Sequence, residues 1–241
     1  MIKKIIILFK IARKIAQSDL INIVSKFHEI PKTIKFFVYI LSFSFSNTVK
    51  QNEVNLNEEE KLCRSIQEMG TTFIKLGQFL STRPDIIGNE IAHKLENLQD
   101  RLPAFETNKA KKIIQKELGD KSYKQLFDIS EPVAAASIAQ VHKAQLNDNG
   151  TIKDVAIKIL RPNIKKVFNE EIDALMLLAF LIEGLIKKTK RLKLVEVVFL
   201  LKEITNLELD LRFEASAANE FAENTKNDVG FNVPKIFWNY T

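Results

Sequence analysis

The feature that most constrains the fold is the stretch 134–160, which predicts a long β-hairpin. Two runs typical of strands, 138–146 and 151–160, flank the tetrapeptide Asn-Asp-Asn-Gly at 147–150. These residue types tolerate positive φ angles, so the chain is expected to reverse direction there. Successive residues of a strand point to opposite faces of the sheet, which separates Lys158 from the branched residues Val155, Ile157 and Ile159.

Lys158 needs an explanation, because an ammonium group in an apolar strand is costly unless an anion meets it. One interpretation is a lysine at the sheet rim, with its aliphatic stem lying on apolar surface. The other is a phosphate-binding lysine, because Val-Ala-Ile-Lys (155–158) on a third strand is a protein-kinase signature. The second is favoured by a loop of small residues at the mouth of the hairpin, where a kinase covers its nucleotide: Ala134, Ala135, Ala136 and Ser137.

Composition excludes several classes of protein. The 241 residues are enough for one large domain or two small ones, and neither Gly and Pro content nor charge indicates disorder. The single cysteine, Cys63, excludes an internal disulfide and suits a reducing compartment. His28, His93 and His142 lack metal-ligand spacing and are interpreted as structural or solvated, so no metal site is predicted.

The net charge of +6 is concentrated in residues 1–50, which hold nine Lys or Arg residues and two acidic ones. Nucleic-acid-binding domains carry basic residues across a folded face, so nucleic acid is not expected as a partner. We predict instead a basic amphipathic arm that binds an anionic membrane surface; the alternative is a helix packed on the following domain. The apolar segment 36–45 is short of the ~20 residues that span a bilayer, and no signal cleavage site follows an apolar core.

Apolar periodicity predicts helices around the hairpin. A helix capped by Asn57 is expected from residue 58 to about residue 80, with Gly70 and Gly77 allowing close backbone approach. Further helices are predicted at 90–100, at 107–118 and, as a buried helix, at 164–188.

The C-terminal helix is predicted to bring an acid to Lys158. A single helix over 195–224 would place Glu214 inside an apolar stripe, where a carboxylate needs a cation, and Lys158 is the expected partner. Residues 231–238 are then expected to begin another strand.

Four motifs occur in a fixed order along the chain. They are Lys-Leu-Gly-Gln (75–78) followed by Ser-Thr-Arg-Pro-Asp (81–85), the alanine-rich segment 134–137, Val-Ala-Ile-Lys (155–158), and Glu-Leu-Asp (208–210) with Glu214. Together they resemble the KxGQ, alanine-rich loop, VAIK and ExD motifs of the UbiB family. This is a family of atypical protein-kinase-like proteins that support ubiquinone (coenzyme Q) biosynthesis.

The resemblance implies an α+β fold in which a helical extension precedes a kinase-like N-lobe, with the C-lobe missing. The implied domains are a membrane-associating arm at 1–50, a helical KxGQ extension at 58–130 and a truncated N-lobe at 131–241. It also implies that ATP or ADP, with Mg²⁺, binds to Ala134, Ala135, Ala136, Ser137, Lys158 and Glu214, with Lys158 on the α- and β-phosphates. Lys75, beside Gln78, would pair with Glu208 of the motif that also contains Asp210.

Catalysis is not expected from these 241 residues alone. The family's catalytic-loop Asp and Asn and its DFG-type Asp lie further along and have no counterpart here, so no catalytic residue is predicted. The expected function is the N-terminal part of a UbiB-type atypical kinase or ATPase, inactive alone and peripheral on the cytoplasmic face of the inner membrane. Its expected partners are ubiquinone-biosynthesis enzymes, lipid intermediates and a separately encoded C-lobe. The alternatives are a non-catalytic membrane-binding regulatory module and the relic of a degraded gene.

Overall fold

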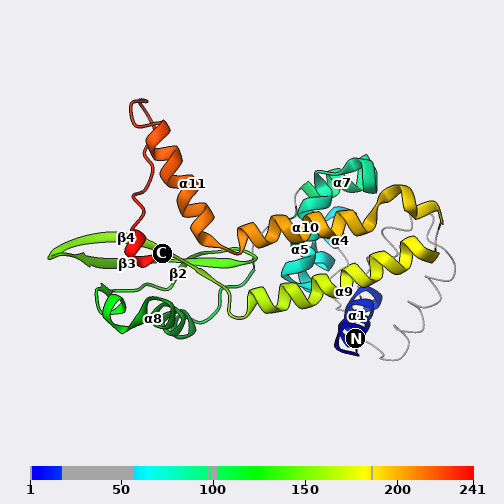
Figure 1. Cartoon of the computed structure of the whole chain (residues 1–241), viewed down its shortest axis with the longest axis horizontal. Helices are drawn as coiled ribbons and strands as arrows, with labels where there is room; N and C mark the ends of the chain where they lie inside the picture. Colours follow the sequence, from blue (N-terminus) through cyan, green and yellow to red (C-terminus); the bar gives the residue numbers. More distant parts are fainter. Residues whose placement is uncertain (1, 18–56, 97, 99–101, 186) are drawn as a thin grey trace. The chain divides into compact units, whose positions relative to one another are not determined.

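A computed structural model describes residues 2–17, 57–96, 98, 102–185 and 187–241, which form two compact units (Figure 1). The helical unit contains residues 1–100 and 165–202, and the sheet unit contains residues 101–164 and 203–241. The predicted α+β class is confirmed, because helices precede and follow a small antiparallel sheet. The three predicted domains are a functional division that these compact units do not test.

The helical unit is built around buried aliphatic and aromatic side chains. Its helices are α1 (Ile2–Gln17), α4 (Glu58–Met69), α5 (Thr71–Ser81), α6 (Pro84–Ile87), α7 (Asn89–Glu96), most of α9 (Ile164–Leu185), the 3₁₀ helix η1 (Lys187–Leu192) and the first part of α10 (Leu194–Glu208). The largest of its fully buried side chains include Leu62, Ile74, Phe168, Ile172 and Leu201. None of the described helices is both long enough and apolar enough to cross a membrane.

The helix predicted from residue 58 to about residue 80 begins as expected but is broken in the middle. Asn57 and Glu60 form a reciprocal capping box, with bonds of 2.8 and 2.9 Å. Gly70 has a φ angle of 105°, which no α-helix contains, so α4 ends there and α5 begins. The second glycine gives space to neighbouring side chains, since a Cβ on Gly77 would lie 2.5 Å from Cδ2 of Leu98.

The sheet unit has four antiparallel strands with the third in the centre. They are β1 (Leu126–Phe127), β2 (Pro132–Ala135), β3 (Ala139–Asp148) and β4 (Thr151–Leu160). β3 pairs with β4 along one edge and with β1 and β2 along the other. Asn149 and Gly150 turn the chain with φ angles of 54° and 87°, as a two-residue hairpin turn requires, so the predicted hairpin is confirmed.

One face of the sheet is covered by α8 (Thr107–Tyr123), while α11 (Leu211–Asn224) lies on the other side (Figure 1). Ala110 and Ile114 of α8 pack with Leu126, Leu146 and Ile159 to form the core of this unit. The predicted helix end at Gly119 is a kink with a φ angle of 75°, after which α8 continues for one more turn.

Three predictions for the second half of the chain are wrong. The helix expected over 195–224 is broken at Asp210, which caps α11 by accepting a 3.2 Å hydrogen bond from the backbone N–H of Arg212. The expected strand at 231–238 is irregular chain followed by the 3₁₀ helix η2 (Trp238–Tyr240). The helix at 164–188 is not buried all round, since Phe180 of α9 is 68% exposed.

Candidate functional site

Three neighbouring strands align small and charged side chains on the sheet face opposite α8, which we call the open face. Ala134 of β2 lies opposite Val141 of β3, and Val141 lies opposite Lys158 of β4. Residues directly opposite each other in an antiparallel sheet share a face, so these three side chains form one row.

Lys158 is held by Glu214, which confirms the predicted pairing. Its Nζ donates to Oε1 at 2.7 Å and to Oε2 at 2.5 Å. The side chains are 40% and 59% exposed, so the prediction of a buried pair is wrong. The break at Asp210 explains the error, because it places Glu214 in the first turn of a new helix and ends the stripe on which the prediction rested. An exposed pair contributes about 0–1 kcal/mol, so its main effect is to orient the lysine.

The alanine-rich segment is partly strand and partly turn. Ala134 and Ala135 belong to β2, while Ala136 and Ser137 make the turn into β3. The turn is tight, because the N–H of Ala136 donates to the carbonyl of Ala139 at 2.8 Å, and Ser137 is fully buried.

Arg161 binds this turn, a contact that the sequence does not predict. Its Nε and Nη2 donate to the carbonyl of Ala136 at 3.0 and 2.8 Å. Its Nη1 donates to the carbonyl of Pro103 at 3.0 Å, and Nη2 also donates to that of Leu102 at 3.3 Å. The acceptors are backbone carbonyls, which leave no signal in the residue pattern.

A buried polar network lies on the α8 side of the sheet. Nδ1 of His142 donates to the carbonyl of Ser130 at 2.7 Å, so Nε2 is the acceptor for the Gln140 amide at 2.8 Å. The same amide accepts from Phe105 N–H at 2.9 Å and donates to Phe105 C=O at 3.1 Å. Both side chains are at most 1% exposed, which confirms the structural interpretation of His142.

The remaining predicted site residues belong to different units. Lys75 and Gln78 lie in α5 of the helical unit, whereas Glu208 ends α10 in the sheet unit. Asp210 caps α11 and accepts from Arg212 Nε at 2.8 Å. The ion pair between Lys75 and Glu208 would connect the two units and stays a prediction.

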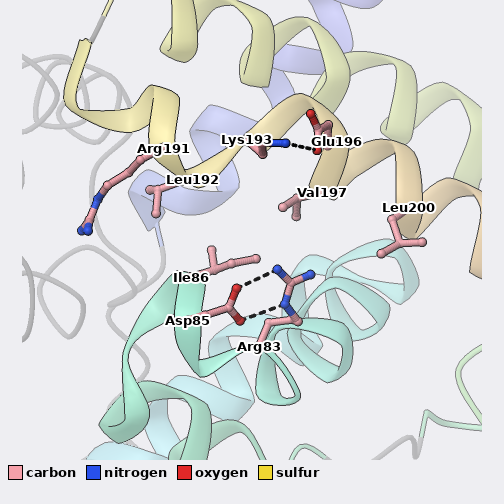
Figure 2. Close-up of a pocket in the computed structure, with 9 residues that line it drawn as sticks. All are labelled: Arg83, Asp85, Ile86, Arg191, Leu192, Lys193, Glu196, Val197 and Leu200. Atoms are coloured by element: carbon pink, nitrogen blue, oxygen red, sulfur yellow. Dashed lines mark hydrogen bonds and ion pairs between the residues drawn. The ribbon is translucent and has the colours of Figure 1, made fainter.

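The helical unit contains a separate cavity of about 260 Å³ between the α6 region and the start of α10 (Figure 2). Four of its five charged lining residues form two pairs: Arg83 donates to Asp85 at 2.8 and 2.7 Å, and Lys193 donates to Glu196 at 3.0 Å. The hydrogen bond from Arg83 lowers the pKa of Asp85. None of the predicted nucleotide-binding residues lines this cavity. Among the residues that the structure describes, no cluster of three or more His, Cys, Asp or Glu side chains could hold a metal ion.

Comparison with known proteins agrees with the family that the four motifs resemble. A family model described as ABC1 atypical kinase-like domain matches residues 97–241. A "Probable protein kinase UbiB" from Marinobacter nauticus is 36% identical over 214 residues, covering 88% of this chain and 38% of the relative. Proteins of the same description from Azotobacter vinelandii and Cellvibrio japonicus are 39% and 36% identical, covering 75% and 77% of this chain.

The chain spans about a third of the length of these relatives, between 33% and 38%. The matched region contains the whole described sheet unit, including the open face, Lys158 and Glu214. This chain therefore belongs to the ABC1/UbiB family of atypical kinase-like proteins.

Proposed function

We propose that the open face of the sheet unit binds ATP or ADP, as part of a UbiB-type atypical kinase or ATPase that supports ubiquinone biosynthesis at a membrane. The observation that carries this proposal is the row formed by Ala134, Val141 and Lys158, with the lysine held by Glu214. An ammonium group fixed beside a turn of small residues is suited to a di- or triphosphate.

The residues on the open face have separate tasks in this proposal. Lys158 donates to the α- and β-phosphates, and Glu214 keeps its ammonium in place while the site is empty. The turn at Ala136 and Ser137 covers the nucleotide with backbone that carries at most a methyl or hydroxymethyl group. Mg²⁺ bound with the nucleotide supplies charge neutralisation at the phosphates, and we assign it no ligand among the described residues.

Saturation-transfer NMR with ATP tests the proposal, because it detects weak binding. We expect the 241-residue chain to show transfer to ATP, and Lys158→Met to abolish it. Lys143→Met is the matched control. Lys143 is an exposed lysine of β3 that also lies on the open face, opposite Ala156 of β4. Equal transfer in wild type and Lys158→Met would contradict the proposal.

Turnover is not expected from this chain alone, because phosphoryl transfer also needs metal ligands and a positioned acceptor. Adding a separately produced C-lobe, if one is encoded alongside, should strengthen nucleotide binding and give hydrolysis. Mg²⁺-dependent ATP hydrolysis by the purified chain, lost in Lys158→Ala, would show that acids within the chain, such as Glu208 and Asp210, hold the metal.

A second role, binding to an anionic membrane surface, is favoured by α1. This helix buries Ile11 and anchors Lys14 by a 2.8 Å bond to the carbonyl of Met69, yet it leaves Ile5, Ile6 and Phe9 between 50% and 57% exposed. Exposed apolar side chains next to basic residues are typical of interfacial helices. The rest of the predicted arm, residues 18–50, lies outside the described residues.

Vesicle co-sedimentation tests this role. The chain should bind anionic vesicles better than neutral ones, and added salt should weaken the binding. Deleting residues 1–50 should abolish it, and equal binding by the deleted form would show that the anchor lies elsewhere. A membrane-bound chain that shows no saturation transfer to ATP would favour the non-catalytic regulatory module.

A further inference from the structure

We propose that Arg161 is the positioning residue of the alanine-rich turn, which it fixes to the segment before α8 in one conformation. The proposal rests on the proposed function only in assuming that this turn faces a nucleotide. The contact itself is independent of any ligand.

The guanidinium group of Arg161 is the link between two pieces of chain. Four of its donor–acceptor contacts, between 2.8 and 3.3 Å, connect the Ala136 carbonyl with those of Leu102 and Pro103. Two nitrogens converge on the Ala136 oxygen, which fixes the direction of that carbonyl as well as its distance. A lysine ammonium is a point charge without this planar fork and could not hold all three carbonyls.

The backbone of Arg161 is held on both sides, which fixes the point from which its side chain reaches the turn. Its N–H donates to the carbonyl of Ile138 at 2.8 Å, which extends the β3–β4 pairing. Its carbonyl accepts from the N–H of Ile164 at 3.2 Å, at the start of α9. The turn is therefore tied to the end of β4, three residues after Lys158.

The segment on the other side of Arg161 is also immobilised. Phe105, two residues beyond Pro103, is bound through its N–H and C=O by the amide of Gln140. Gln140 is in turn bound by His142, whose other nitrogen is bound to Ser130. The Ala136 carbonyl is thus attached through Arg161 to a support built on β3.

This attachment sets where the turn lies relative to the ammonium of Lys158. Alanine already restricts the backbone more than the glycines of an ordinary nucleotide-covering loop. With the Ala136 carbonyl also fixed, the turn keeps its position before a nucleotide arrives, and the ligand must fit the space that exists. Arg161 would act on nucleotide affinity through the turn, without touching the nucleotide.

Hydrogen exchange of the 241-residue chain without nucleotide tests the contact. In Arg161→Lys, amides of the turn (136–139) should exchange at least about tenfold faster, the factor expected from losing one hydrogen bond to a charged group. Exchange in β4 and α8 should stay unchanged. Arg212→Lys is the matched control, because Arg212 uses the same fork on the carboxylate of Asp210 in the same unit. It should leave the turn unchanged.

Saturation transfer to ATP provides the functional measurement. Arg161→Lys should weaken transfer relative to wild type, whereas Arg212→Lys should not. Unchanged exchange at the turn would overturn the proposal, and so would faster exchange throughout the sheet unit, which would make Arg161 a general stability residue. A loosened turn with wild-type nucleotide affinity would overturn the positioning role. Wild-type protein that gives no ATP signal would count against the proposed function, while the exchange result would still decide the contact.

Arg161→Gln is measured in parallel, because it keeps a planar donor group when the charge is lost. It should also loosen the turn without unfolding the chain. Unfolding of both variants would overturn the proposal, since Arg161 would then be needed for the fold itself.

Discussion

Replacing Gln140 with leucine should strongly destabilise the sheet unit, although the new side chain has a similar size and is apolar. The amide satisfies Phe105 N–H, Phe105 C=O and Nε2 of His142, and leucine satisfies none of them. A buried polar group left without a partner costs about 1–3 kcal/mol. Two effects reduce the destabilisation. Phe105 is only half-buried, so water can reach part of its backbone, and burial of the apolar leucine is itself favourable. We therefore expect the free energy of unfolding to fall by about 2–4 kcal/mol.

Gln145→Leu is the matched control for this prediction. Gln145 lies on the same strand, but on the open face, and donates to Asp154 at 3.2 Å. Its replacement should change the stability by less than about 0.5 kcal/mol.

Urea unfolding followed by tryptophan fluorescence is the suitable measurement, because the chain's single tryptophan, Trp238, lies in the sheet unit. A local probe is needed because a chain of two units need not unfold in one transition. A loss below 1 kcal/mol for Gln140→Leu, or one equal to that of Gln145→Leu, would refute the reasoning. The double variant with His142→Phe should lose less than the sum of the single variants, since the two residues share one hydrogen bond.

Three further predictions concern other parts of the molecule. A double-mutant cycle with Lys158→Met and Glu214→Gln should give a coupling of about 0.2–1 kcal/mol for this exposed pair, and a value above 3 would show that it is desolvated. In urea unfolding, Gly77→Ala should destabilise the helical unit by about 1–3 kcal/mol, because the new methyl group overlaps Leu98. Gly184→Ala in α9 should instead stabilise this unit by about 0.5–1 kcal/mol, because there is open space around Gly184. Burial, aided by Glu59, raises the pKa of the Cys63 thiol, so it should react with a disulfide reagent much more slowly in the native protein than in denaturant; equal rates would contradict this.

The local parts of the fold could be predicted from the sequence, because their signals lie within a few residues. The turn at 149–150 needs residues that accept positive φ, and the Asn57 capping box needs an acid three residues later. The side-chain alternation of β4 likewise gave the correct face for Lys158.

Two of the predicted helices are wrong because a helical pattern continues in the sequence across a break in the structure. A helical-wheel projection of the sequence cannot show that Gly70 adopts a positive φ or that the side chain of Asp210 caps a new helix. The predicted partner of Lys158 was correct for a partly wrong reason, since Glu214 reaches the lysine from an exposed first turn.

The support behind the alanine-rich turn could not be predicted at all. Arg161 and Gln140 bind backbone groups of residues 25 to 59 positions away. Any residue type can supply such groups, so the sequence holds no pattern that points to them.

All four strands come from residues 126–160, and this closeness in sequence has a consequence for biosynthesis. Glu214 follows Lys158 by 56 residues, so at about 5–20 residues per second it is synthesised roughly 3–11 s later. A hairpin forms in about 1–10 μs, far faster than this interval. On the ribosome, we therefore expect the sheet to fold with the Lys158 ammonium still unpaired, and α11 to dock afterwards onto a finished surface.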